Sequence, residues 1–278
     1  IEKVLMIPWL YPLADRIVSV SRAVREELIS YFGLKGEKID VIYNSFDNEG
    51  IKAKSIEPVP EKFNIIFNHP VVITCGRLVL QKNHSGLLNA VSLALEMTNF
   101  KLVIVGDGPL KTELLNQSEK LNLKVYVEGK DKKISSDYQI YFLGFQKNPF
   151  SFMKLAKVFV LTSDWEGFPL APCEAMICGL PVISTDCPTG PREILSPDSS
   201  PIANVDLQKA EYAKYGILMP MLQPANENKG DSIWAQAIVN LIEDKKLMEE
   251  YANKGKIRIQ ELGIKNINNE WGELLQKI

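Results

Sequence analysis

Two glutamates eight positions apart, Glu166 and Glu174, are candidates for binding a ligand rich in hydroxyl groups. The apolar run 158–161 before them indicates a buried strand, and residues 171–178 indicate a short helix that ends at Gly179. Glu166 is therefore expected on a loop at the carboxyl end of a strand, the edge at which open α/β sheets bind ligands. Glu174 is expected in the first turns of the next helix, close to backbone N–H donors. Alternatively, Glu166 is a solvated loop residue and Glu174 a favourable first-turn charge.

A second candidate site is the loop 76–83, which follows the apolar run 71–75. Gly76 allows the backbone to turn sharply where the strand ends. Arg77 and Lys82 then place two cations ahead of a predicted helix N-terminus, an arrangement that binds a diphosphate without a metal ion. An Arg-x4-Lys spacing by itself is also common on protein surfaces.

Two further turns lie at the ends of predicted strands. Gly106, Asp107 and the Gly-Pro pair that follows indicate a tight strand-to-helix turn, which needs no ligand to explain it. Gly144 and Phe145 follow the next strand. The ring of Phe145 could stack on a ligand or pack into the protein, and we expect packing.

The elements that carry these loops alternate between strand and helix. This alternation predicts βαβ units, right-handed crossovers and one doubly wound, Rossmann-like parallel sheet of the α/β class. Residues 123–139 are charged and are predicted to form an exposed excursion. The predicted strands are 71–75, 101–105, 141–143, 158–161, 181–184 and 216–219, and the predicted helices are 84–96, 110–121, 149–155, 171–178, 232–242, 246–262 and 266–278. Before this domain, strands at 16–20 and 39–43 flank a helix at 22–31, and a short helix is expected around 61–67.

Two patterns give the chain a family resemblance. They are Glu-x7-Glu with Gly-Phe-Pro between the glutamates, and Gly-Arg-x4-Lys-Asn starting at Gly76. In this order they resemble the signature of the retaining nucleotide-sugar glycosyltransferases of family 4 (glycosyl transferases group 1), over roughly residues 14–278. The resemblance implies the GT-B fold, with this chain supplying the Rossmann-like C-terminal domain and lacking most of the N-terminal domain.

The resemblance also implies roles for individual residues. Arg77 and Lys82 bind the diphosphate and neutralise the leaving group, Glu166 lies beside the donor sugar, and Glu174 binds the ribose. The loop 185–194 closes the far side of the sugar pocket, although Arg192 and Glu193 could instead form a local surface ion pair. The catalytic residues are then Glu166, Arg77 and Lys82, and the nucleotide-sugar contacts are Gly76, Arg77, Lys82, Gly106, Asp107, Gly144, Phe145, Gly167, Phe168, Leu170 and Glu174.

The implied reaction is transfer of a hexosyl unit from a nucleotide-sugar, which we expect to be UDP-linked, to a glycan or lipid-linked glycan acceptor in polysaccharide biosynthesis. Neither a protein nucleophile nor a metal or cofactor is implied. Two alternatives remain. One is a sugar-nucleotide epimerase of the same architecture, which would need acid/base residues that a chain with two histidines does not obviously offer. The other is a non-catalytic nucleotide-sugar-binding module.

The resemblance divides the chain into four parts. Residues 1–48 are a remnant of the N-terminal acceptor domain, 49–69 a linker, 70–262 the nucleotide-sugar-binding domain, and 263–278 a helix that returns toward the N-terminal domain. Such a chain should bind donor and transfer poorly alone. The alternative is a complete small protein that begins with a strand.

Composition narrows the remaining possibilities. The chain has 278 residues with a net charge of −2, so no basic excess indicates nucleic-acid binding. Its apolar runs are strand-sized, well short of the roughly 20 residues of a membrane-spanning helix. The four cysteines fit reduced thiols of a cytoplasmic protein, and two histidines make a histidine-based zinc site unexpected. We expect a cytoplasmic protein, with peripheral contact to the inner face of the membrane through the missing N-terminal domain.

Overall fold

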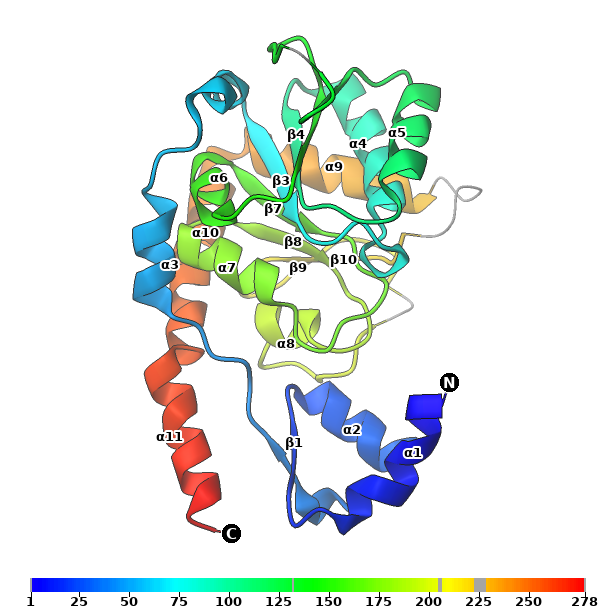
Figure 1. The fold of residues 1–278 in the computed structure, drawn as a ribbon, viewed down its shortest axis with the longest axis vertical. Helices are drawn as coiled ribbons and strands as arrows, with labels where there is room; N and C mark the ends of the chain where they lie inside the picture. Colours follow the sequence, from blue (N-terminus) through cyan, green and yellow to red (C-terminus); the bar gives the residue numbers. More distant parts are fainter. Residues whose placement is uncertain (1, 132, 205–206, 223–228, 278) are drawn as a thin grey trace.

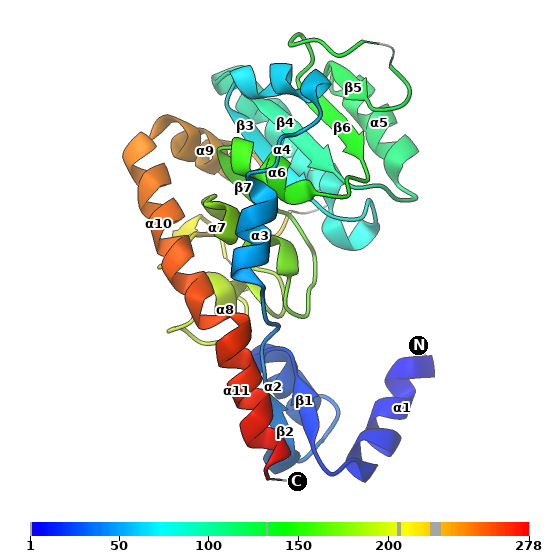
Figure 2. The ribbon, with the colours of Figure 1, turned by 60° about the vertical axis from the view of Figure 1, so that its left-hand side comes forward.

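A computed structural model describes residues 2–131, 133–204, 207–222 and 229–277. A large layered α/β unit occupies most of the molecule, and a smaller unit made by the start of the chain lies at one end of it (Figure 1). The C-terminal helix runs alongside this smaller unit (Figure 2).

The smaller unit contains a βαβ motif. β1 (Ile17–Ser19) and β2 (Ile39–Val41) pair in parallel, and α2 (Arg22–Ser30) connects them. Ser21 begins α2 because its side chain accepts a hydrogen bond from the backbone N–H of Val24. The two strands and the helix predicted here are confirmed to within a residue or two. The other elements are helical: α1 (Glu2–Leu10), which was not predicted, and the 3-10 helices η1 (Tyr11–Leu13) and η2 (Gly36–Lys38).

The chain reaches the larger unit through two helical segments. α3 (Asn48–Ser55) was not predicted, and it begins where the side chain of Asp47 accepts a hydrogen bond from the backbone N–H of Gly50. The second segment, predicted as a short helix, is the 3-10 helix η3 (Glu61–Asn68). The ring of Phe63 in η3 packs against that of Phe152, with centroids 5.5 Å apart. These segments therefore cover part of the larger unit.

The larger unit is built on an eight-stranded sheet in the order β5-β6-β4-β3-β7-β8-β10-β9. Neighbouring strands are parallel, except that β9 runs antiparallel to β10. The doubly wound parallel sheet predicted from the sequence is confirmed. The strands are β3 (Val71–Cys75), β4 (Lys101–Val105), β5 (Val125–Val127), β6 (Ile140–Gly144), β7 (Val158–Leu161), β8 (Val182–Thr185), β9 (Glu211–Tyr212) and β10 (Ile217–Met219).

Helices cover both faces of this sheet, and alternate residues of each strand enter one of two cores. Val72 packs with Leu87 and Trp234 on one face, while Ile73 packs with Phe152 and Met176 on the other. Burial of both faces explains why the strands are almost continuously apolar. The helices of the first face are α4 (His84–Met97), α5 (Lys111–Lys120) and α9 (Lys229–Glu243), and those of the second are α6 (Pro149–Leu155), α7 (Leu170–Cys178) and α8 (Pro191–Leu195).

The last two helices connect the large unit to the small one. α10 (Lys245–Glu261) lies along α7, and Gly255 of α10 faces Met176. α11 (Ile264–Leu275) then packs Ile267 and Leu274 against Ile42, which follows β2. Apolar contacts thus join the C-terminal helix to the small unit.

The prediction for residues 123–139 is wrong in part. Residues 125–127 are not part of an exposed excursion, because they form β5 at the edge of the sheet and pair with β6. Tyr126 is buried, and its hydroxyl donates a hydrogen bond to Glu128 Oε2 at 2.7 Å. A strand of three residues is too short to show an alternating pattern that stands out from a charged surrounding sequence.

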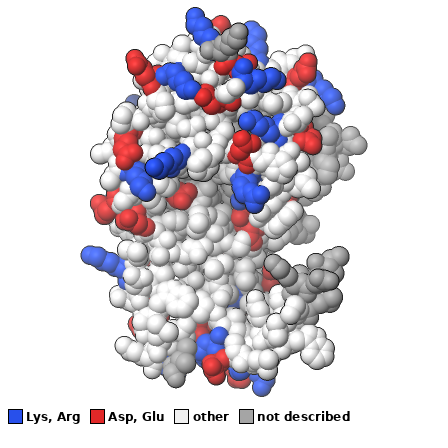
Figure 3. All heavy atoms as spheres, in the orientation of Figure 1, with Lys and Arg blue, Asp and Glu red and all other residues white. Residues whose placement is uncertain are grey.

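Positive and negative side chains are mixed over the face shown in Figure 3, and no single-sign area dominates that face. Within the described ranges, no helix combines the length and apolar character needed to span a bilayer.

Candidate functional site

The strand order creates a crevice beside β3. From β3 the chain moves to β4 and β6 on one side of the sheet, and then returns to place β7 and β8 on the other side. The loops that follow β3 and β7 therefore lead away from a topological switch point, where open α/β sheets bind their ligands. These loops are 76–83 and 162–169, which carry Arg77, Lys82 and Glu166.

Glycines let the first three loops at this edge pack backbone against backbone. Gly106 has φ of +141°, and a Cβ there would lie 1.9 Å from the carbonyl oxygen of Gly76. A Cβ on Gly108 would lie 2.5 Å from the carbonyl oxygen of Leu78. The N–H of Gly106 donates to the carbonyl oxygen of Gly144 at 2.8 Å. Larger residues at positions 106 and 108 would force these loops apart, so glycine is required to bring them together.

These loops and α7 enclose a cleft of about 350 Å³. Six residues predicted from the sequence line it together: Gly76, Arg77, Gly106, Asp107, Phe145 and Glu174. The cleft also contains residues that the sequence reasoning missed: Cys75, Val105, Gln146, Pro149 and Ala171. Of these, Gln146 is polar, and its place directly after Phe145 is the signal that could have identified it.

Three residues that line this cleft, Arg77, Asp107 and Phe145, are exposed. The phenyl ring of Phe145 is 80% exposed, so the expectation that it packs into the protein is wrong. Gly144 before it has φ of +66°, a left-handed conformation that turns the chain outward at the end of β6. Arg77 is also exposed, and the described part of the chain gives its guanidinium no ion pair. The side chains of Phe145 and Arg77 are therefore free to contact a ligand.

Glu174 lies in the first turns of α7, as predicted, and it is half-buried. Burial raises the pKa of its carboxyl group. Burial also raises the pKa of the neighbouring Cys75 thiol, with a further contribution from the charge of Glu174. The described residues provide no hydrogen-bond donor to Glu174, so its carboxylate can accept hydrogen bonds from hydroxyl groups of a ligand.

Glu166 is held by an ion pair beside this cleft. Lys82 Nζ lies 2.5 Å from Glu166 Oε1, and Ser163 Oγ donates to the same oxygen at 2.7 Å. The side chain of Glu166 is only 8% exposed, so these two partners offset the cost of burying its negative charge. The stem of Lys82 passes close to Gly76, since a Cβ on that glycine would lie 3.6 Å from Lys82 Cε. Lys82 therefore connects the cleft to Glu166.

The loop after β8 supports the Glu166 loop from the far side. The N–H of Glu166 donates to the carbonyl oxygen of Pro188 at 3.2 Å, and the hydroxyl of Thr189 donates to the carbonyl oxygen of Glu166. A Cβ on Gly190 would lie 2.6 Å from Pro169 Cδ, so the two loops are in close contact. Residues 186–190 thus form a wall next to Glu166.

The remaining predicted residues of this loop differ in exposure. Phe168 is 5% exposed and its ring packs on Tyr43, so only its backbone can reach a ligand. Leu170 is exposed at the start of α7. Gly167 faces the small unit, because a Cβ there would lie 3.6 Å from Val20 Cγ2.

The surface ion pair between Arg192 and Glu193, which was the alternative for this loop, does not form. Consecutive residues of a helix point in different directions, and both side chains are buried. Arg192 donates instead to Asp186 and Glu211. Glu193 accepts hydrogen bonds from the small unit.

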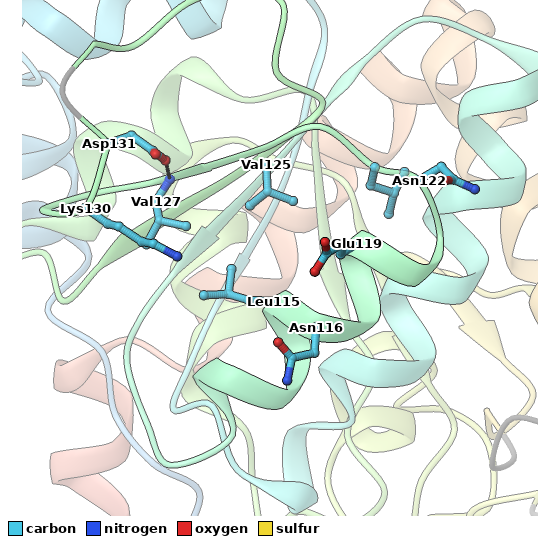
Figure 4. Close-up of a pocket in the computed structure, with 9 residues that line it drawn as sticks. Leu115, Asn116, Glu119, Asn122, Val125, Val127, Lys130 and Asp131 are labelled. Atoms are coloured by element: carbon cyan, nitrogen blue, oxygen red, sulfur yellow. Dashed lines mark hydrogen bonds between the residues drawn. The ribbon is translucent and has the colours of Figure 1, made fainter.

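A second hollow, of about 400 Å³, lies between α5 and β5 (Figure 4). It contains Lys130 and Asp131 at one end and Asn116 and Glu119 of α5 at the other. It lies at the edge strand, away from the switch point and from Arg77. In the described ranges, no group of three or more His, Cys, Asp or Glu side chains is arranged to hold a metal ion.

His84, at the start of α4 behind the loop 76–83, should make stability depend on pH. It is 3% exposed, and burial, with a smaller contribution from Lys82, lowers its pKa to about 4. In the unfolded chain the pKa is near 6.5, so between these values the unfolded state binds more protons. The stability that neutral His84 contributes is present above pH 6.5 and is lost as the pH falls toward 4.

We therefore expect His84→Asn, which cannot charge, to lose less stability on acidification than the unchanged protein. The expected difference is roughly 1–3 kcal/mol between pH 7 and pH 4. Urea unfolding of both proteins at each pH measures this difference. Both proteins have the same carboxylates, so the loss of stability that those groups cause is the same in each. Equal losses in both proteins would show that folding does not lower the pKa of His84.

Residues 55–206 match the model of a family described as glycosyl transferases group 1, and residues 3–49 match that of glycosyltransferase family 4. An uncharacterised glycosyltransferase of Methanocaldococcus jannaschii is 34% identical over 284 residues, which cover 98% of this chain and 66% of that protein. The N-acetylgalactosamine-N,N'-diacetylbacillosaminyl-diphospho-undecaprenol 4-alpha-N-acetylgalactosaminyltransferase of Campylobacter jejuni is 32% identical over 253 residues, which cover 91% of this chain and 58% of that protein. The chain thus spans less than two thirds of the length of either relative.

Solved structures resemble this one over nearly the whole chain. Anabaena HepE in complex with UDP and glucose superposes with a TM-score of 0.72 at 22% identity, over 95% of this chain and 64% of that one. A variant of S. aureus TarM in complex with fondaparinux, alpha-GlcNAc-glycerol and UDP superposes with a TM-score of 0.70 at 20% identity. The superposition covers 98% of this chain and 46% of that one. At these identities the likeness shows the fold alone.

Proposed function

The chain belongs to the glycosyl transferases group 1 family and has the GT-B fold, and we propose that it binds the donor of a retaining glycosyltransferase. The donor is a UDP-linked hexose. The acceptor is a hydroxyl of a glycan or lipid-linked glycan. The observation that carries the proposal is the switch-point cleft, in which Arg77 and Glu174 face one hollow beside the Lys82–Glu166 pair. The name of the Campylobacter jejuni relative, which includes a diphospho-undecaprenol, supports the acceptor class.

Each part of the cleft suits one part of a UDP-sugar. The Arg77 guanidinium binds the diphosphate. Glu174 accepts hydrogen bonds from ribose hydroxyls. The exposed face of Phe145 is available to stack on the base. Glu166 and the wall 186–190 then lie on the sugar side.

The chemistry proposed for this arrangement is a displacement at the anomeric carbon on the leaving-group face. The bond from that carbon to the phosphate oxygen breaks, the bond to the acceptor oxygen forms, and the acceptor proton leaves with UDP. Arg77 and Lys82 neutralise the charge that develops on the departing phosphate. Glu166 orients the donor sugar and forms no covalent bond to it.

The same proposal assigns the parts of the chain. Residues 1–48 end the acceptor domain, 49–69 link it to the donor domain at 70–262, and 263–278 return to the acceptor side. The protein acts in the cytoplasm at the inner face of a membrane, where lipid-linked acceptors are presented.

A thermal-shift screen of UDP-, GDP- and ADP-sugars tests the donor class, because it needs no acceptor. We expect UDP-sugars to raise Tm most, since binding to the folded state alone stabilises it. Analysis of the sugar released by the best donor separates the alternatives: a free epimer formed without acceptor would indicate an epimerase. A screen in which no nucleotide-sugar raises Tm would contradict the proposal.

Binding of UDP should not need a divalent metal. The sequence has no Asp-x-Asp triplet, and the cleft meets phosphate charge with the guanidinium of Arg77. Calorimetric affinity for UDP should therefore change less than about twofold between buffer with EDTA and buffer with manganese, well under the 1.4 kcal/mol of a tenfold change. Affinity that disappears with EDTA and returns with manganese would contradict this expectation.

A further inference from the structure

Glu193 is a fully buried carboxylate at the junction of the large and small units, with 0% exposure. Its oxygens accept hydrogen bonds from the backbone N–H groups of Arg22 at 2.8 Å and Ala23 at 2.9 Å. The hydroxyl of Tyr43 donates to it at 2.8 Å, and Arg22 Nε at 3.3 Å. All four donors belong to the small unit, about 150 or more positions away in the sequence.

These contacts make the position of α2 depend on Glu193. The first N–H groups of a helix have no partner within it, and the helix N-terminus favours a negative charge. Glu193 satisfies two of these groups at the start of α2 from outside the helix. A buried carboxylate that lost these donors would be strongly unfavourable. The carboxylate and the start of α2 are therefore each stable only while the other is in place.

The same part of the small unit contacts the loop that carries Glu166. The ring of Tyr43, which donates to Glu193, packs on Phe168 with centroids 5.1 Å apart. Asn44 Nδ2 donates to the carbonyl oxygen of Phe168 at 3.5 Å. Phe168 lies two residues after Glu166, and the start of α8, which carries Glu193, follows the wall that accepts the N–H of Glu166. Glu193 thus connects to Glu166 through Tyr43 on one side and through residues 188–190 on the other.

We propose that Glu193 is a positioning residue that holds the 166–170 loop, and with it Glu166, by anchoring the start of α2 and Tyr43. The inference rests on the proposed function, in which Glu166 orients the donor sugar. Glu193 does not line the cleft, so it acts through these contacts and leaves nucleotide binding to Arg77 and Glu174.

Glu193→Gln tests this role, because the amide keeps the volume and replaces one acceptor oxygen with a donor facing the N–H groups of α2. We expect amide exchange at Arg22, Ala23 and Glu166, measured by NMR on this chain, to rise at least about tenfold. Turnover of the UDP-sugar, by transfer or hydrolysis, should show kcat lowered about tenfold with donor KM and UDP affinity changed less than about twofold.

Two further variants sharpen the comparison. Tyr43→Phe removes one hydrogen-bond donor to Glu193 and keeps the ring on Phe168. It should therefore also raise amide exchange and lower kcat, but by less than Glu193→Gln does. Combined with Glu193→Gln it should add nothing, because both act on one contact. Glu211→Gln is the matched control. Its carboxylate accepts from Arg192 and does not contact the small unit, so exchange at Arg22 and Ala23 should not change.

The outcomes separate the two proposals. Faster exchange at Arg22 and Ala23, with unchanged exchange at Glu166 and unchanged kcat, would show that Glu193 only caps α2, and would overturn the inference. If the unchanged chain binds no UDP-sugar, the proposed function fails. In that case exchange at Glu166 in Glu193→Gln and Tyr43→Phe still decides whether Glu193 holds the loop.

Discussion

Replacing Glu166 with glutamine is expected to lower kcat for donor turnover by about 100-fold or more, as loss of a well-placed electrostatic group does. Glu166 accepts from Lys82 and Ser163 beside the cleft, so its charge is held in one place. An interaction that strengthens only in the transition state changes kcat, while one made equally in the ground state changes KM. UDP alone lacks the sugar, so its affinity for Glu166→Gln should remain within about twofold.

The matched control for this variant is Glu174→Gln, the same substitution at the other carboxylate. Glu174 lines the cleft, so its loss should raise the donor KM and weaken UDP itself, while kcat changes less. Steady-state kinetics on both variants measures kcat and the donor KM, and calorimetry measures their affinity for UDP. An equal fall in UDP affinity in the two variants would show that the carboxylates do not have separate roles. Unchanged turnover in both would show that neither contributes.

Replacing Arg77 with alanine is expected to weaken UDP affinity by about 1.5–3 kcal/mol, the usual value of a charge-assisted hydrogen bond, or roughly 10- to 150-fold. Arg77 is exposed at the cleft and has no ion pair in the described part of the chain, so its removal should not disturb the fold. Lys82 is a less suitable choice, because Lys82→Ala would leave the nearly buried Glu166 charge without its partner.

Lys120→Ala, which removes an exposed cation from α5, is the control for lost positive charge. It should leave UDP affinity unchanged, and calorimetry at two salt concentrations checks that long-range screening does not explain the Arg77 effect. If Arg77→Ala binds UDP as tightly as the unchanged chain, the loop after β3 is not the diphosphate site.

The sheet and its site were predictable because local signals agree with the tertiary structure. The strands β3, β4 and β7 are apolar runs followed by glycine or polar turns, and parallel pairing brings their ends to one edge. Arg77, Gly106 and Glu174 lie on different loops or helices, yet the order of the strands is enough to predict that they meet. Their individual roles at the site remain predictions.

The features that could not be predicted from the sequence depend mostly on contacts with residues far away in the chain. The residues that satisfy Glu193 are about 150 or more positions earlier, and the only partner that the sequence offered as an alternative was its neighbour Arg192. Phe145 was expected to pack because it is apolar, but the left-handed turn at Gly144 directs the chain outward. β5 and α3 are short, and pairing or packing with distant elements stabilises them more than their own composition does.

In the proposed function, UDP binds in the cleft between the loops after β3, β4 and β6 and the start of α7. A crystal structure of this chain with UDP tests it most directly. We expect the diphosphate to lie next to Gly76 and Arg77, and the ribose hydroxyls to lie within hydrogen-bond distance of Glu174. Well-defined UDP elsewhere, such as in the hollow between α5 and β5 shown in Figure 4, with the switch-point cleft empty, would contradict it.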